Sequence, residues 1–303
     1  MSAGVFESVI AHALKATLDE IIDDPTDGYE QKAIFPKWCD IGKMTDAYED
    51  DLEMGGPGLA SEVNEGQELP SGTIREGYLT RYIARKFGLK ILVTDEAIED
   101  NKYPEVIKAA RRLKRALWKT ADIDATNMLA RAFNTAYVGG DGQPLCSSAH
   151  TLPNGGTFSN VMATPMSPSR AAFIIARSQV MKFPGHDGTI EGADIEAVLH
   201  PVEQWAVWEG LVKSSKAPEA GNFNEINVAY THDFKLIPIK YWVNTTTNYI
   251  FQTDVDNGLQ FRWRRRPRST SWNENATEVG LYGISARWAR GWSDPRSVLG
   301  CQA

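Results

Sequence analysis

Residues 104–136 read PEVIKAARRLKRALWKTADIDATNMLARAFNTA, and this stretch predicts the longest helix of the chain. Apolar residues recur in it every three or four positions, with no internal glycine or proline. These positions are Val106, Ala110, Leu113, Leu117, Ala121, Ala125, Met128 and Ala132. The other face of the first half carries the cations Lys108, Arg111, Arg112, Lys114, Arg115 and Lys119. At about 1.5 Å per residue the helix spans about 50 Å, which is typical of a structural spine.

On the C-terminal side of this helix, runs of strands stand beside a few helices. Gly139-Gly140-Asp141-Gly142 ends the long helix, and residues 143–165 are loop-like. Further helices are predicted at about 167–182 and at 201–214, where Trp205 and Trp208 lie three residues apart. Strands are predicted at 194–200, 226–253, 258–266 and 276–292. Because no regular βαβ repeat is present, the pattern predicts an α+β fold. We expect at least one of the two tryptophans to be buried.

On the N-terminal side, residues 44–74 form the most unusual window. It holds eight acidic residues and no lysine or arginine. The acidic residues are Asp46, Glu49, Asp50, Asp51, Glu53, Glu62, Glu65 and Glu68. Gly55-Gly56-Pro57-Gly58 breaks any helix here, and loops this long are usually functional or disordered. We therefore expect a long exposed excursion, partly a hairpin, followed by strands at 77–94.

The first residues predict a helix at 5–22 that ends at the breakers of residues 23–28. A terminal helix with a loose connector either docks on another molecule or packs on its own domain, and the pattern leaves both open. No basic stretch precedes an apolar segment, so no signal peptide is expected. No stretch is long and apolar enough to predict a membrane span.

Composition and cysteine usage narrow the function classes. The chain has 303 residues and a formal net charge of -7. Tight nucleic-acid binders usually carry a basic excess, so nucleic-acid binding is not expected as the main role, although lying beside DNA inside a container stays open. Cys39, Cys146 and Cys301 are far apart and odd in number. They predict reduced thiols in a cytosolic protein rather than a disulfide framework or metal knuckle.

The spacing of the histidines, of Asp254 and of Cys146 matches no complete catalytic or metal-binding motif. The five histidines, His12, His150, His186, His200 and His232, form no H-E-x-x-H or H-x-H motif. Asp254 begins a calcium-like loop, but its twelfth position is Arg265 instead of glutamate. Cys146 lies near His150 without a visible oxyanion device. We expect no catalytic residue, cofactor or metal, and a soluble hydrolase would need a convergent polar pocket.

A basic run precedes the last strand pattern. Its arginines are Arg262, Arg264, Arg265, Arg266 and Arg268. Such a run can bind nucleic acid. Alternating arginines on a strand more often pair with acidic neighbours of the same chain or of another subunit. We favour pairing, and Arg264 and Arg266 are candidates for contacts between subunits.

A series of short phrases runs through the chain in a fixed order. They are MGGPGL (54–59), EGY (76–78), FGLKI (87–91), TDEAIEDNKY (94–103), GGDGQPLCSSAH (139–150), GGTFSN (155–160), TDVDNGL (253–259) and GWSDPR (291–296). In this order the phrases resemble the Mu-type major head subunit family of tailed bacteriophages. The resemblance covers nearly the whole chain from about residue 45, and it implies the Hong Kong 97-like capsid fold.

The resemblance implies a layout of five parts. They are an N-terminal arm at 1–43, an extended loop (a β-hairpin) at 44–93, a peripheral domain at 94–164 with the spine helix 104–136, an axial domain at 165–255, and return strands of the peripheral domain at 256–303. The implied function is that of a major capsid protein that self-assembles into hexamers and pentamers of an icosahedral shell around double-stranded DNA. An encapsulin-like shell around protein cargo is the alternative within the same fold.

The resemblance also implies partners and a location. The partners are other copies of the chain, a portal protein, a scaffolding protein or maturation protease, decoration proteins, and packaged DNA without sequence specificity. The location is the virion, after assembly in the host bacterial cytoplasm and without a membrane. Because the sequence starts directly at the arm, a scaffolding segment would either have been removed or belong to a separate protein.

Opposite charges predict a contact between subunits. The acidic excursion and the spine helix are segments that the resemblance places against each other across a subunit boundary. We therefore expect salt bridges between them. The candidate residues are Asp50, Asp51, Glu53, Glu62 and Glu65 on the excursion, and Arg111, Arg112, Arg115 and Lys119 on the helix.

Overall fold

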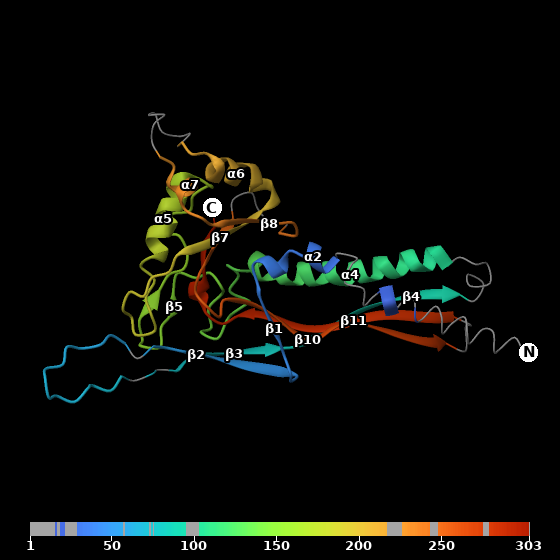
Figure 1. Cartoon of the computed structure of the whole chain (residues 1–303), viewed down its shortest axis with the longest axis horizontal. Coiled ribbons are helices and arrows are strands. Elements are labelled where there is room, and N and C mark those ends of the chain that lie inside the picture. The colour runs from blue at the N-terminus through green and yellow to red at the C-terminus, as the bar shows by residue number, and fades with distance from the viewer. Residues whose placement is uncertain are drawn as a thin grey trace, which may run out of the picture.

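The computed structural model describes two sheet-based regions and a hairpin that projects away from them (Figure 1). The described residues are 16, 19–21, 29–56, 58–72, 74, 76–94, 103–216, 226–242, 248–274 and 279–302. The predicted helix at 5–22 lies almost wholly outside these residues.

The first region is built on a long four-stranded sheet in the order β1–β10–β11–β4. Strand β1 pairs parallel with β10, whereas β11 pairs antiparallel with both β10 and β4. The strands are β1 Asp40–Lys43, β4 Arg85–Thr94, β10 Leu259–Glu274 and β11 Val279–Trp292. The predicted extended loop of 44–93 included residues 85–93. These residues instead form β4 at the edge of this sheet.

The long helix α4, Tyr103–Ala130, packs on one face of this sheet (Figure 1). Its predicted apolar stripe is buried, from Val106 to Ala132. The helix ends six residues before the predicted position 136 because a tight turn follows. There the Asn134 N–H donates to the Arg131 carbonyl at 2.9 Å, and the Asn134 side chain accepts the Ala136 N–H. Lys114 was expected on the exposed face, but it is 5% exposed and donates to the Ile21 carbonyl.

The two faces of the long sheet are chemically different. Side chains alternate across a strand. Phe261, Trp263 and Trp288 therefore point toward α4 and join its core, with ring centroids 5.1–5.9 Å apart. Arg262 and Ala289 point the other way, toward Tyr82 of the hairpin. The sheet thus separates an apolar helix side from a hairpin side.

The second region surrounds a four-stranded sheet in the order β12–β9–β7–β8. Its strands are β7 Ile195–Pro201, β8 Lys235–Ile239, β9 Tyr249–Thr253 and β12 Val298–Cys301. Its helices are α5 Arg170–Val180, α6 Trp205–Lys213 and α7 Val228–Thr231. Trp208 is fully buried in the core of this region, and Trp205 is 51% exposed. The expectation that at least one of them is buried is confirmed.

The predicted arm at 1–43 is partly wrong. Its last part contains α2 Tyr29–Lys32 and the 3-10 helix η2 Phe35–Lys37, and it then enters the long sheet as β1. Phe35 and Trp38 are buried in the same core as α4. The reason is that Asp122 of α4 accepts the backbone N–H groups of Ile34 and Phe35 at 2.8 and 3.0 Å.

Two further predictions need correction. Residues 228–231, predicted as strand, form α7, because the Asn227 side chain accepts the Ala229 N–H and caps a helical turn. The last residues, predicted to return to the first region, form β12, which pairs with β9 of the second region. The remaining elements are short: β5 His150–Thr151, β6 Thr157–Phe158, η3 Val202–Gln204 and η4 Pro295–Ser297.

Candidate functional site

The projecting hairpin is the first candidate for a contact surface. Strand β2, Tyr48–Met54, pairs antiparallel with β3, Glu76–Ile83. The described residues between them form no strand, and they extend far beyond the body (Figure 1). An isolated two-stranded hairpin is marginally stable in water. Its position therefore depends on contacts at its base or with another molecule.

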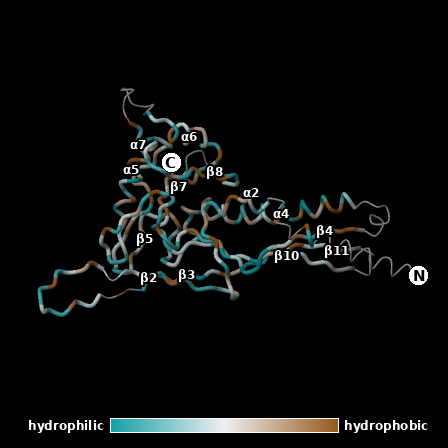
Figure 2. Tube along the Cα trace, in the orientation of Figure 1, coloured by the Kyte–Doolittle hydropathy of each residue, from teal (hydrophilic) through white to brown (hydrophobic). Residues whose placement is uncertain are grey.

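The hairpin exposes apolar side chains. Leu59 is 83% exposed and Leu69 is 79% exposed, and Leu79 and Ile83 of β3 are also exposed. Figure 2 shows hydrophobic and hydrophilic positions interspersed along this projecting segment. Burial of these exposed apolar side chains against a partner would be favourable, which makes the hairpin a candidate interaction surface.

Arg262 anchors the inner part of the hairpin to the long sheet. Its guanidinium lies 2.8 Å from the Glu49 carboxylate and 3.4 Å from Asp51. It also stacks over the Tyr82 ring at 4.7 Å. The Ser293 hydroxyl donates to Asp51 at 2.5 Å. One mostly buried cation thus holds both strands of the hairpin against β10.

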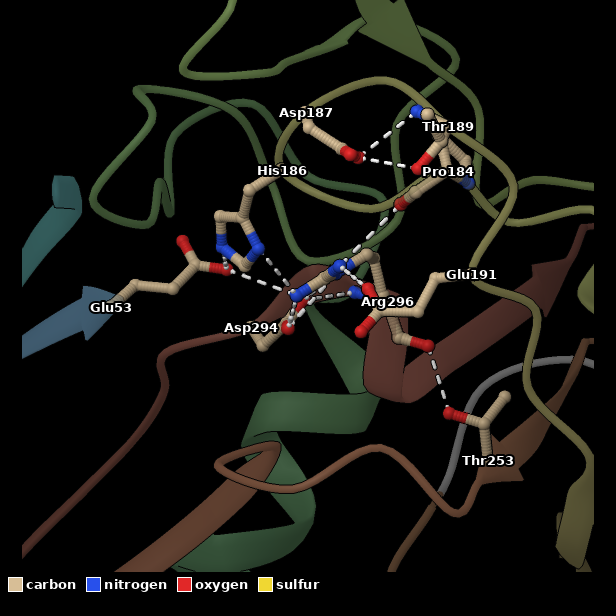
Figure 3. A network of polar contacts seen from close by, with 9 residues as sticks. All are labelled: Glu53, Pro184, His186, Asp187, Thr189, Glu191, Thr253, Asp294 and Arg296. Atoms are coloured by element: carbon tan, nitrogen blue, oxygen red, sulfur yellow. Dashed lines mark hydrogen bonds and ion pairs between the residues drawn. The ribbon is translucent and has the colours of Figure 1, made fainter. Parts of the chain in front are cut away.

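A second network anchors the outer end of β2 (Figure 3). Arg296 donates to Asp294 at 2.6 Å and to Glu191 at 2.9 Å. It also donates to His186 Nδ1 at 3.1 Å, which leaves the imidazole proton on Nε2, 2.7 Å from Glu53 Oε1. Nε2 and the Glu53 carboxylate are close, but no hydrogen bond forms between them.

This second network joins three parts of the chain. Glu53 belongs to the hairpin, His186 and Glu191 to the loop after α5, and Asp294 and Arg296 to the turn before β12. Burial alone would lower the pKa of Arg296, but the hydrogen bonds and negative charge of Asp294 raise it above its ordinary value. The guanidinium is therefore a permanent buried charge, and it depends on its carboxylates.

Four of the predicted contact residues have partners in their own chain. Asp50 forms a bidentate pair with Arg81 at 2.6 and 2.7 Å, and that hydrogen bond lowers the pKa of Asp50. Asp51 and Glu53 belong to the two anchors, and Arg266 pairs with Glu30 at 2.9 Å. These four side chains are therefore paired within the subunit.

The other predicted contact residues lack such partners. Glu62 and Glu65 are exposed on the loop. Arg111, Arg112, Arg115 and Lys119 are exposed on α4 and form no ion pair within the described part of the chain. Arg264 is half-buried in β10.

A basic cleft is the second candidate surface. It has a volume of about 880 Å³ and lies between α2, α4 and the end of β8. Its lining includes six cations: Lys32, Lys37, Arg112, Arg115, Lys119 and Lys240. The sequence pattern predicts only the three on α4. The other three come from segments far apart in sequence, which no local pattern brings together.

The three cysteines and His150 lie in surroundings that indicate a structural role. Cys39, Cys146 and Cys301 are buried, and burial raises the pKa of Cys39 and of Cys146. The His150 ring is buried between Asp141, at 2.5 Å, and Asn160, at 3.1 Å. Within the described ranges, no group of three or more histidine, cysteine and acidic residues could hold a metal ion. No helix of that part of the chain is long and apolar enough to cross a membrane.

Comparison with known protein families gives one match. The sequence profile of a family described as phage capsid protein matches residues 78–300. No protein with a curated description matches the sequence significantly.

Several solved structures share the fold at low sequence identity. A chain from the procapsid of bacteriophage JBD30 has a TM-score of 0.54 and 13% identity, over 100% of this chain and 76% of that one. A chain from Microbacterium phage Oxtober96 has a TM-score of 0.54 and 9% identity, over 88% and 90%. A virus-like particle from Pyrococcus furiosus has a TM-score of 0.54 and 9% identity, over 95% and 98%. At such identities these likenesses establish the α+β fold of this capsid group.

Proposed function

The chain belongs to the phage capsid protein family, and from this premise we propose that its copies meet as hexamers and pentamers of an icosahedral phage head. It is a major capsid protein, a structural subunit of the virion. The profile match over residues 78–300 carries this conclusion. Family membership implies a structural role rather than catalysis.

The finer assignment is our proposal. The ordered phrases from residue 54 to residue 296 favour the Mu-type major head subunit group. A head of that type encloses double-stranded DNA and meets a portal protein, and its assembly needs a scaffolding protein or a maturation protease. Decoration proteins are further candidate partners.

The projecting loop is the proposed contact with a neighbouring subunit. Leu59 and Leu69 lie exposed on it beside Glu62 and Glu65. Burial of the leucines would stabilise the contact, and the acidic residues would favour one register over others. Because the same weak contact repeats around a closed symmetric shell, many copies together make assembly cooperative.

Electron microscopy of the purified full-length protein tests the proposal. Closed shells of uniform size support it. A monodisperse monomer under all assembly conditions, or only irregular aggregates, would contradict it.

An encapsulin-like container is the second candidate. The virus-like particle from Pyrococcus furiosus has the same TM-score as the procapsid chain of bacteriophage JBD30, so the fold alone does not separate a phage head from another closed shell. The contents of particles isolated from infected cells do. Nuclease-protected DNA supports a phage head, and a single co-purifying protein inside DNA-free shells supports the alternative.

A further inference from the structure

The basic cleft concentrates positive charge in an acidic chain. Six cations line it, while the whole chain has a formal net charge of -7. Among the described residues that line it, Asp122 is the only one with a carboxylate. Asp122 is buried, accepts two backbone N–H groups from Ile34 and Phe35 and interacts electrostatically with Lys240, but its single charge does not balance six cations.

Aromatic rings position three of the cations of the cleft. Arg115 and Lys32 lie over the Tyr29 ring at 6.0 and 5.6 Å, and Lys119 lies over the Tyr241 ring at 5.7 Å. An aromatic face holds a cation without cancelling its charge. None of the six forms an ion pair with a carboxylate within the described ranges. The cleft therefore presents an ordered positive surface to an anion.

The cleft and the acidic hairpin lie on opposite sides of the long sheet. Phe261 and Trp263 of β10 face α4, which lines the cleft, and Arg262 between them faces the hairpin. Figure 1 shows the same arrangement, with α2 and α4 on one side of β10 and β11 and the hairpin on the other. In a closed symmetric shell every copy turns the same side inward. If the loop meets a neighbouring copy on the hairpin side of the sheet, the cleft side stays open to another ligand.

We propose that the basic cleft faces the interior of the shell and binds the phosphate backbone of the enclosed DNA. The proposal rests on the proposed function, since it needs a closed shell with DNA inside. Cations that neutralise phosphates supply sequence-independent affinity, which suits a container for any genome. It also replaces the predicted pairing of Arg112, Arg115 and Lys119 with the acidic loop of another subunit.

Binding of a fluorescein-labelled 30-base-pair duplex to the unassembled full-length chain tests the proposal, by fluorescence anisotropy. The cleft variant combines Arg112→Gln, Arg115→Gln and Lys119→Gln. The control variant combines Lys43→Gln, Lys86→Gln and Lys182→Gln, which removes the same charge from exposed positions outside the cleft. Circular dichroism and thermal melting establish that both variants fold.

At roughly 50 mM salt the cleft variant is expected to bind the duplex at least about tenfold more weakly than the control variant. A plot of the logarithm of its binding constant against the logarithm of the salt concentration is expected to have a slope smaller in magnitude by about 3. Equal affinities of the two variants would overturn the proposal. Displacement of the duplex by a synthetic peptide of residues 58–72 would also overturn the proposal if the peptide does not bind the cleft variant. The acidic loop would then be the occupant of the cleft.

Assembled particles supply a second measurement. Lysine acetylation of DNA-filled and emptied shells, read by mass spectrometry, is expected to show protection of Lys37 and Lys119 in filled shells only, with Lys43 and Lys86 unchanged. Equal reactivity in both states would contradict the inference while the shells themselves still support the proposed function. Absence of any shell would instead contradict the proposed function.

Discussion

The two faces of the long sheet are formed by the same strands but make different kinds of contact. Toward α4, Phe261, Trp263 and Trp288 pack ring against ring and exclude water. Toward the hairpin, Arg262 meets Glu49 and Asp51 through directed polar contacts. Burial of apolar area is strong and non-directional, whereas ion pairs and hydrogen bonds need a defined geometry. One face therefore stabilises the subunit, and the other orients its projecting hairpin.

The largest expected effect is on the helix face. Trp288→Ala removes a side chain at the centre of the aromatic cluster and also the hydrogen bond from its indole N–H to Asp124 at 2.9 Å. It is expected to lower the free energy of unfolding by about 4 kcal/mol. Urea denaturation measures the change. A loss below about 1 kcal/mol would show that this face is not the main source of stability.

The second expected effect is at the outer anchor of the hairpin. Arg296→Met leaves the buried carboxylate of Asp294 without its cation, and it is expected to cost about 3 kcal/mol. The double variant Arg296→Met with Asp294→Asn removes both charges and is expected to regain a large part of that loss. If the double variant is as unstable as the single one, the network stabilises through packing rather than charge.

A smaller effect is expected at the inner anchor. Arg262→Gln is expected to cost about 1–2 kcal/mol, because Glu49 and Asp51 lose a mostly buried partner. Limited proteolysis should then cut the hairpin faster while the rest of the subunit stays protected. Arg81→Gln is the matched control, since its pair with Asp50 is on the exposed part of the same hairpin. Equal rates of hairpin cleavage in the two variants would show that Arg262 anchors the hairpin no more strongly than Arg81 does.

The smallest effect is a pH dependence in the second region. Burial lowers the pKa of His200, whose Nδ1–H donates to the Pro201 carbonyl at 2.8 Å. The folded state therefore favours the neutral ring, while the unfolded chain takes up a proton near pH 6.5. Stability from this residue is full above about pH 6.5 and falls as the pH drops below that value. His200→Asn is expected to flatten this part of the curve of unfolding free energy against pH. An unchanged curve would show that groups other than His200 cause the pH dependence of the free energy of unfolding.

The sequence predicted the elements whose signals are local. The apolar stripe from Val106 to Ala132 predicted α4, and the acidic run with its glycines predicted the exposed hairpin. It did not predict that Phe35 and Trp38 enter the core, because η2 is only three residues long and shows no periodicity. Its burial depends on Asp122, far away in sequence.

For the predicted contact residues, too, local sequence signals did not reveal partners that are distant in the sequence. The charge pattern and the resemblance together predicted that Asp50, Asp51 and Glu53 pair with the spine helix of another subunit. Their partners Arg81, Arg262 and His186 follow only from the strand register and the turns between distant segments. For the same reason the network around Arg296 and the full lining of the basic cleft could not be predicted from sequence.

Replacement of residues 58–72 by a short Gly-Ser linker tests most directly whether the hairpin side directs assembly. The described residues of this loop are mostly exposed, so the variant is expected to keep the free energy of unfolding of the wild-type subunit within about 0.5 kcal/mol. Electron microscopy under conditions in which the wild-type protein forms uniform closed shells should show none for the variant. Closed shells of normal size from a folded variant would contradict the claim that this loop joins one subunit to the next.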